Sequence, residues 1–256
     1  MTKNILSTLF TASFFFLMSC SSNTENSTTA ATEDASVEEV TEPLTSPAVC
    51  IWDKIVVRAT PAKDGKYVTR LSVGESLTYL GKDSTVDEKT YAYVLLNDGK
   101  EGWAISDFIV NNAKPAVVVT DINMYSRPDL LTKTEKVFKM MDIVSSIEVQ
   151  EDWMKIKGRR SGAKWMDEGW VKSENISFEA VDIAGAKFAL EALAIEDEDK
   201  RREALNDIIN NSDLSGSKFI LELETTLMEM EGIGEEDVEA ELEDVAIEEE
   251  STDSIN

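Results

Sequence analysis

The segment 159–167 carries the side chains best suited to hold an anion, namely Arg159, Arg160, Lys164 and Trp165. A guanidinium donates paired hydrogen bonds to a carboxylate or phosphate, and an indole ring offers a flat face for stacking. We therefore expect the two arginines and the tryptophan to bind an anionic ligand. The competing interpretation is a solvated hairpin tip.

Three further aromatic residues, Tyr67, Tyr125 and Trp153, are candidates for lining a peptide groove. Rings in loops and at strand ends line such grooves in peptide-binding domains. The alternative for each ring is that it caps a hydrophobic core.

The absence of histidine narrows the possible chemistry. Ser-His-Asp and Cys-His catalysis and histidine-ligated metal sites are excluded. Neighbouring carboxylates such as Asp167 and Glu168 leave a glycosidase as a rival hypothesis, but such pairs are common in a chain with 50 acidic residues. We expect a binding protein, with no enzymatic activity, no metal and no cofactor.

The N-terminus has the layout of a secretory signal, with Lys3 followed by the apolar run Ile5–Met18. This run of fourteen residues is too short to span a bilayer. Leu17-Met18-Ser19-Cys20 resembles the lipobox of bacterial lipoproteins, which implies that residues 1–19 are removed and that Cys20 is acylated. The lipid would anchor the chain to a membrane. Since Ser21 replaces the aspartate that retains some lipoproteins at the inner membrane, the resemblance implies the outer membrane, facing the periplasm or the cell surface.

Charge is distributed unevenly along the chain. The expected tether, residues 20–47, has eleven Ser or Thr, six acids and no Lys or Arg after its first residue, a composition typical of disorder. Residues 48–179 carry 19 basic and 20 acidic side chains, whereas residues 180–256 carry 5 and 24. A nearly neutral central region between acidic segments lacks the excess of positive charge that binding to duplex nucleic acid requires.

The middle of the chain contains an internal repeat. Two pairs of segments align: PAVCIWDKIVVRATP (Pro47–Pro61) with PAVVVTDINMYSRP (Pro115–Pro128), and EGWAISDFI (Glu101–Ile109) with EGWVKSENI (Glu168–Ile176). The second copy is longer at 159–167. The alignment predicts two copies of one unit, over residues 48–112 and 113–179.

Each copy shows five short β-branched or alternating runs typical of strands. They are Ile55–Arg58, Ser76–Leu80, Tyr91–Leu96, Gly102–Ile105 and Phe108–Val110, then Ile122–Tyr125, Val144–Gln150, Trp153–Lys157, Gly169–Lys172 and Ile176–Phe178. Five strands in about 60 residues suit a small barrel.

The stretch IVVRATPAKDGKYVTRLSVGESLTYLGK and the Gly-Trp pair near the end of each copy resemble the bacterial SH3-like domain. This resemblance covers residues 48–179 and implies two SH3-like β-barrels in tandem. It also implies a binding module of the cell envelope whose ligands are peptidoglycan peptides or proteins.

Two repeat positions are expected in the core. Trp103 and Trp170 recur in register, and a repeated Gly-Trp in a small barrel is more often core packing than a ligand platform. Cys50 aligns with the strand-like Val118, so we predict a buried thiol.

Beyond Val181 the apolar period changes to that of helices. Apolar faces recur around Ala186, Leu205 and Leu223, which predicts a helical region over 180–231. For the acidic tail, 232–256, a solvated charge run, an amphipathic docking helix and weak calcium binding remain open.

These features together predict a mainly β protein with a helical, acidic C-terminal region. The expected function is that of a lipid-anchored envelope protein that binds a peptidoglycan peptide or an envelope protein. Two alternatives are an assembly or stress adaptor that acts through its C-terminal helices and, less favoured, a glycosidase-type wall enzyme.

Overall fold

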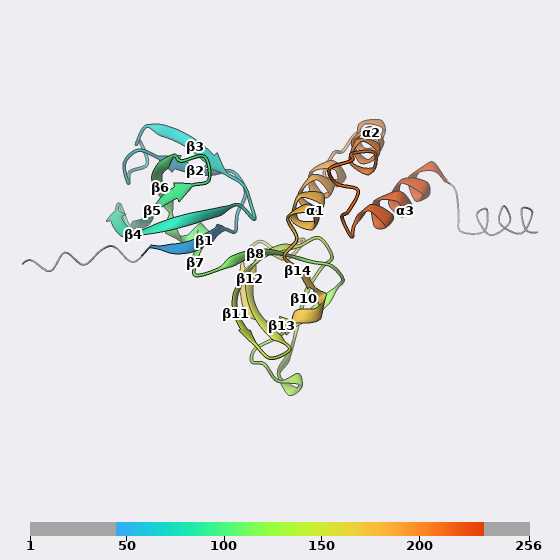
Figure 1. Cartoon of the computed structure of the whole chain (residues 1–256), viewed down its shortest axis with the longest axis horizontal. Coiled ribbons are helices and arrows are strands. Elements are labelled where there is room, and N and C mark those ends of the chain that lie inside the picture. The colour runs from blue at the N-terminus through green and yellow to red at the C-terminus, as the bar shows by residue number, and fades with distance from the viewer. Residues whose placement is uncertain (1–44, 233–256) are drawn as a thin grey trace, which may run out of the picture. The chain divides into compact units, whose positions relative to one another are not determined.

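The computed structural model describes residues 45–232 (Figure 1). The expectations for the signal peptide, the Cys20 lipid, most of the tether and the acidic tail lie outside the described residues. The described chain is mainly β, with two seven-stranded sheets followed by three α-helices, and it belongs to one compact unit. Among these residues, no helix combines the length and the apolar character needed to cross a membrane.

The first half of the β region, residues 46–111, forms one antiparallel sheet. Its strands are β1 (Ser46–Cys50), β2 (Ile55–Arg58), β3 (Tyr67–Leu71), β4 (Ser76–Val86), β5 (Lys89–Leu96), β6 (Glu101–Ile105) and β7 (Ile109–Asn111). They follow the order β3-β2-β6-β5-β4-β1-β7. The sheet encloses a core that includes Val57, Leu71 and Val94.

The second half, residues 114–177, forms the other sheet. Its strands are β8 (Lys114–Val118), β9 (Ile122–Tyr125), β10 (Lys133–Phe138), β11 (Ile143–Gln150), β12 (Trp153–Gly158), β13 (Asp167–Lys172) and β14 (Ile176–Ser177). The order β10-β9-β13-β12-β11-β8-β14 is the first order with every strand number raised by seven. Phe138, Ile156 and Val171 lie in its own core. The halves that align in sequence therefore share one strand order.

The expectation of five strands per copy is wrong, because each sheet has seven. The missed strands β1 and β8 contain Pro47 and Pro115, and proline argues against a strand in sequence. The missed β3 and β10 each lie at one end of their sheet, and each has a single buried residue. A strand with one paired side and little burial carries a weak apolar signal.

The Gly-Trp pairs have a steric explanation. A Cβ added at Gly102 would lie 2.5 Å from Val57 Cγ1 and 2.8 Å from the Arg58 carbonyl oxygen. Since glycine lets β6 approach β2, it takes the inward position and Trp103 takes the outward one. Trp103 is half-buried and outside the core of the first sheet, contrary to our expectation, whereas Trp170 is buried as predicted.

Cys50 is buried in the core of the first sheet, as predicted. Its thiol donates a hydrogen bond to the Trp52 carbonyl oxygen at 3.1 Å. Burial raises the pKa of this thiol from 9.0 to about 12, so the reactive thiolate is almost absent at neutral pH.

We predict that Cys50 in the folded chain does not react with a disulfide reagent such as DTNB at pH 8, and reacts at once in guanidinium chloride. The measurement uses a Cys20→Ser chain, so that a single thiol is counted. Fast labelling of the native chain at pH 8 would contradict the buried, protonated thiol.

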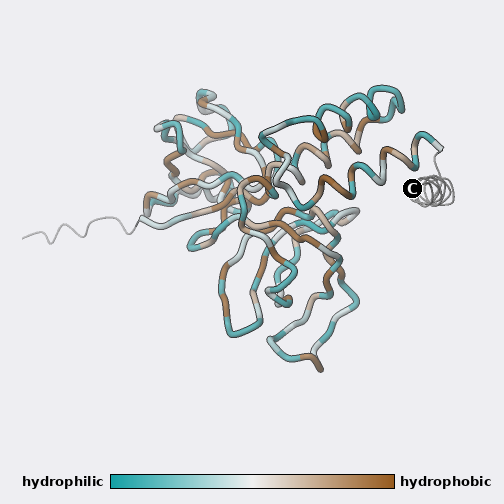
Figure 2. Tube along the Cα trace, turned by 45° about the vertical axis from the view of Figure 1, so that its right-hand side comes forward, coloured by the Kyte–Doolittle hydropathy of each residue, from teal (hydrophilic) through white to brown (hydrophobic). Residues whose placement is uncertain are grey.

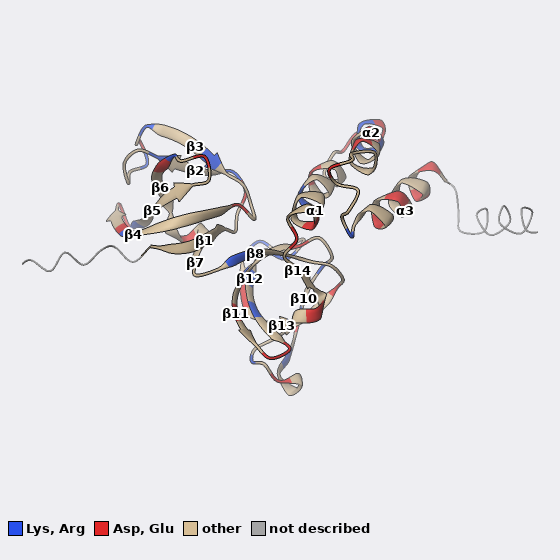
Figure 3. Ribbon diagram, viewed as in Figure 1, with Lys and Arg blue, Asp and Glu red and all other residues tan. Residues whose placement is uncertain are grey.

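The C-terminal region contains α1 (Ala180–Leu193), α2 (Glu198–Ile209) and α3 (Ile220–Glu231), as the helical period predicted. Apolar and polar residues alternate along the helices (Figure 2), and acidic residues recur along α2 and α3 (Figure 3). Ala186, Leu205 and Leu223 are buried in one cluster, joined by Ile143 of the second sheet. The helices thus share a core with the second half.

Candidate functional site

A cavity of about 280 Å³ lies where the turn after β1 meets the connection between β12 and β13. The turn contributes Trp52 and Asp53, and the connection contributes residues 159–162. Asp142, from the turn before β11, and Leu190 of α1 also line the cavity. The long connection that the sequence singled out therefore lines a real cavity.

Arg159 has the arrangement expected of an anion receptor. Its guanidinium lies over the Trp52 ring, 4.8 Å from the ring centroid, and the residue is exposed. Within the described residues, its side chain takes part in no hydrogen bond or ion pair. Such a cation–π contact favours this placement of the guanidinium over the ring and leaves its N–H donors available to a ligand.

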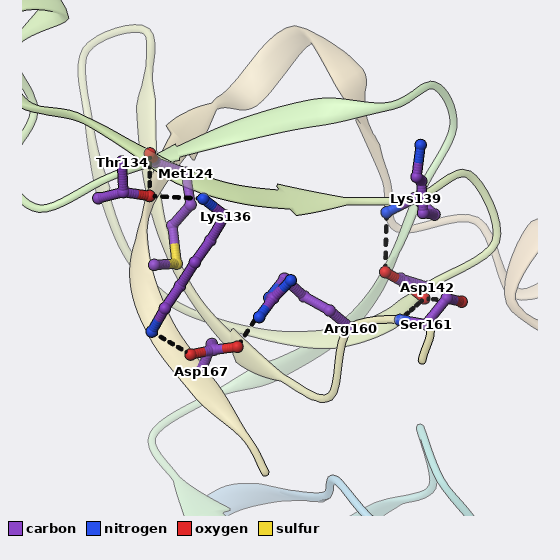
Figure 4. Close-up of polar contacts among 8 residues, drawn as sticks. All are labelled: Met124, Thr134, Lys136, Lys139, Asp142, Arg160, Ser161 and Asp167. Atoms are coloured by element: carbon purple, nitrogen blue, oxygen red, sulfur yellow. Dashed lines mark hydrogen bonds and ion pairs between the residues drawn. The ribbon is translucent and has the colours of Figure 1, made fainter. Parts of the chain in front are cut away.

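Arg160 is already engaged within the protein. Its Nε donates to Asp167 Oδ2 at 2.7 Å, and Lys136 pairs with the other carboxylate oxygen (Figure 4). Burial alone would raise the pKa of Asp167, but hydrogen bonds and charge from Lys136 and Arg160 hold it below its ordinary value. Arg160 therefore ties the connection to β13, although it also lines the cavity.

Ser161, two residues after Arg159, is held by Asp142. The backbone N–H and the hydroxyl of Ser161 donate to Asp142 Oδ1 at 2.9 and 2.6 Å, and the Lys139 N–H donates to Oδ2 at 2.8 Å (Figure 4). Burial raises the pKa of Asp142, and these hydrogen bonds oppose that rise. With Arg160 and Ser161 both held, the position of Arg159 at the cavity is fixed.

Trp165 lies on the same connection but does not line this cavity. It is 73% exposed, and Lys164 Nζ lies 5.3 Å from its ring centroid. The structure thus separates the predicted group: it brings Arg159 and Arg160 to the cavity and leaves Trp165 facing solvent.

The other three predicted residues also lie away from the cavity. Tyr125 and Trp153 contact each other edge to face, with ring centroids 4.9 Å apart. Trp153 is buried beneath Lys172, whose Nζ lies 4.3 Å from its centroid. Tyr67, in β3 of the first sheet, is 56% exposed.

Sequence reasoning missed Trp52 and Asp142 as parts of the site. One signal was present for the first, because Trp52 stands where the aligned second copy has Thr120. A large ring at a position that the repeat fills with a small polar residue is not required by the shared fold.

The rival acid pair is poorly arranged for glycosidase chemistry. Lys155 lies 2.8 Å and Lys157 3.8 Å from the Glu168 carboxylate, and the hydrogen bond from Lys155 lowers the pKa of Glu168. The pKa of Asp167 is also lowered. A general acid at neutral pH needs a raised pKa, so neither carboxyl suits that role.

No protein-family model matches the chain, and no curated protein matches it. Among solved structures, it is similar to NlpC2 from Trichomonas vaginalis, with 13% identity over 59% of this chain and 56% of that chain, at a TM-score of 0.23. NlpC1 from the same organism gives 13% identity over 57% of this chain and 53% of that one, also at a TM-score of 0.23. The chain thus spans little more than half the length of these structures, and a likeness this weak carries no inference about fold or function.

Proposed function

We propose that the chain is a non-enzymatic, lipid-anchored protein of the bacterial envelope whose two halves are SH3-like modules in tandem. Its ligand is a carboxylate-bearing peptide, either from peptidoglycan or from an envelope protein. The SH3-like assignment draws on the sequence resemblance, and the strand order common to both halves supports a duplicated module. The anchor at Cys20 draws on the lipobox resemblance alone.

One observation carries the binding proposal: the Arg159 guanidinium is stacked on Trp52 beside a cavity, without an anionic partner among the described residues. A guanidinium held in one plane binds a carboxylate through two parallel hydrogen bonds. Its side-chain order is established before the ligand arrives, which reduces the entropy lost on binding.

The cavity wall also indicates the kind of peptide. Asp53 and Asp142 line it together with Arg159 and Arg160. Carboxylates on the wall repel a purely anionic ligand and favour one that carries an amino or amide group near its carboxylate. A short peptide with both groups meets this requirement, whereas a bare phosphate does not.

The test is co-sedimentation of the full chain with purified peptidoglycan sacculi, with Cys20→Ser to remove acyl chains. We expect binding that Arg159→Ala weakens about tenfold, as for loss of a charge-assisted bidentate contact. Arg127→Ala is the matched control, because this exposed arginine has no side-chain partner among the described residues and lies away from the cavity. Equal binding by the two variants would contradict the site.

A chain that stays in the supernatant would shift the proposal to a protein ligand. That result would favour the adaptor alternative, which one observation supports. Leu221 and Met228, seven residues apart on one face of α3, are 74% and 46% exposed. Exposed apolar side chains on one helix face suit contact with a partner protein.

A further inference from the structure

A row of aromatic and cationic side chains crosses the first sheet. Arg58 is the cross-strand partner of Tyr67 on one side and of Trp103 on the other, and Trp103 is in turn the partner of Tyr93. Lys82 of β4 continues the row, with its Nζ 5.7 Å from the Tyr93 ring centroid. We call these five residues the aromatic row.

The aromatic row lies on the outer face of the sheet. The neighbours of Trp103 along β6, Gly102 and Ala104, are buried, and successive side chains of a strand point to opposite faces. Tyr67 and Lys82 are exposed, and the other three members are half-buried. With strands spaced about 4.8 Å apart, a row across five strands is roughly 19 Å long.

The rings of the row are presented in an ordered way. Tyr93 and Trp103 stack with centroids 4.9 Å apart and planes inclined by 38°. The Tyr93 hydroxyl donates to Glu101 Oε2 at 2.7 Å, which fixes that ring. Arg58 Nη1 donates to the Gly65 carbonyl oxygen at 2.8 Å, which fixes the guanidinium between Tyr67 and Trp103.

The cations of the row are not neutralised by the protein. In the part of the chain that the structure describes, neither Arg58 nor Lys82 forms an ion pair with a carboxylate. Each flanks an aromatic ring. The surface therefore combines faces for stacking with positive charge at both ends of the Trp103–Tyr93 pair.

This surface suits an extended glycan better than a peptide. Four of the five strands that the row crosses are paired on both sides, and only β3 has a free edge. A peptide added there as a further strand would lie beside Tyr67 alone and would not cover the row. The row residues line neither the Arg159 cavity nor the two cavities beside Gly74 and beside Lys172, so recognition at the row would rest on exposed faces and not on any of these pockets. Ring faces and free cations remain, and these fit pyranose rings that bear anionic groups.

We propose that the aromatic row binds an extended anionic glycan. Sugar rings lie on Tyr67, Trp103 and Tyr93, and carboxylate or phosphate groups pair with Arg58 and Lys82. This surface lies on different elements from the Arg159 cavity, so the proposal stands apart from the peptide-binding function above.

The second sheet supplies an internal comparison. At the same positions it has Lys133, Tyr125, Trp170 and Lys155, joined by the same cross-strand pairs. There, however, Trp170 is buried, and Lys155 is paired with Glu168 at 2.8 Å. In this second row the central tryptophan is closed off and the lysine beside it is neutralised, and only Lys133 at its end is exposed without a carboxylate partner among the described residues. We therefore expect the second row not to bind the glycan.

The experiment measures binding of the full Cys20→Ser chain to three polymers by isothermal titration calorimetry: polygalacturonate, neutral dextran and poly-L-glutamate. We expect polygalacturonate to bind most tightly. Tyr67→Ala and Lys82→Ala should each weaken it about fivefold, as for loss of one stacking or charge contact. Tyr125→Ala, which removes the tyrosine of the second row at the position equivalent to Arg58, and Arg159→Ala should leave it unchanged.

Three results would overturn the proposal. The first is no binding of polygalacturonate. The second is poly-L-glutamate binding as tightly, because charge alone would then explain the affinity. The third is an equal loss of polygalacturonate affinity on Tyr125→Ala and Tyr67→Ala, because the aromatic row would then have no special role.

Discussion

Asp182→Ala should lower the free energy of unfolding by about 3 kcal/mol, because it removes the acceptor at the centre of a buried polar network. Asp182 is 1% exposed and joins three elements. Its carboxylate accepts from the Ser177 hydroxyl at 2.5 Å and from the Lys218 N–H at 2.8 Å, with Lys218 Nζ at 3.5 Å. The substitution leaves the Ser177 and Lys218 donors without this partner.

The same network gives a pH dependence with a definite sign. Burial alone would raise the pKa of Asp182, but hydrogen bonds from Ser177 and Lys218 and the lysine charge hold it below its ordinary 3.8. A lowered pKa means that the unfolded chain binds the proton more tightly. The stabilisation is therefore present above about pH 4 and is lost as pH falls through the folded-state pKa.

Urea unfolding followed by circular dichroism at 222 nm checks both statements. Asp207→Ala is the matched control, since Asp207 is exposed on α2 and has no side-chain partner among the described residues. We expect the control to change stability by less than about 0.5 kcal/mol. A loss on Asp182→Ala no larger than that of the control would rule out the network as a source of stability.

Gly102→Ala should destabilise the first sheet by about 2 to 3 kcal/mol, more than Gly169→Ala destabilises the second. At Gly102 the new methyl group would meet a β-branched side chain and a carbonyl oxygen within 2.8 Å. At Gly169 its nearest atoms, at 2.7 Å, belong to the flexible Met124 side chain, and the Tyr125 oxygen is 3.0 Å away. Methionine can move aside, whereas valine and backbone cannot.

Thermal melts of the three single variants Gly102→Ala, Gly169→Ala and Gly216→Ala provide the measurement. Gly216 is the control, because a Cβ there would meet nothing within 4 Å. The expected order of the decrease in Tm is Gly102 first, Gly169 second and Gly216 last. A larger decrease in Tm for Gly169→Ala than for Gly102→Ala would contradict the explanation that these glycines are needed for close approach between strands.

The sequence predicted the elements whose signals are local. The runs at 55–58 and 122–125 match β2 and β9 residue for residue, and the helical period located all three helices. The sequence did not predict strands whose formation depends on their pairing partners. Proline-containing β1 and β8 are strands because β4 and β11 pair with them, a fact that no local pattern reveals.

The candidate site, too, could be predicted from the sequence only in part. Composition and spacing identified the segment that carries Arg159 and Arg160, but the two arginines look equivalent in sequence. Their difference arises from contacts distant along the chain, since Asp167 engages Arg160 whereas the Trp52 ring lies under Arg159. Trp52 lies more than 100 residues from Arg159, so only folding brings the two together.

The central claim is that Arg159 and Trp52 form a preorganised carboxylate receptor, and NMR titration of the full Cys20→Ser chain with soluble muropeptides from digested sacculi tests it most directly. We predict that the Arg159 Nε–H and Trp52 indole N–H signals shift together and saturate. The Trp165 and Trp103 indole signals should stay in place. Saturable shifts confined to other residues, with Arg159 and Trp52 unmoved, would contradict the claim.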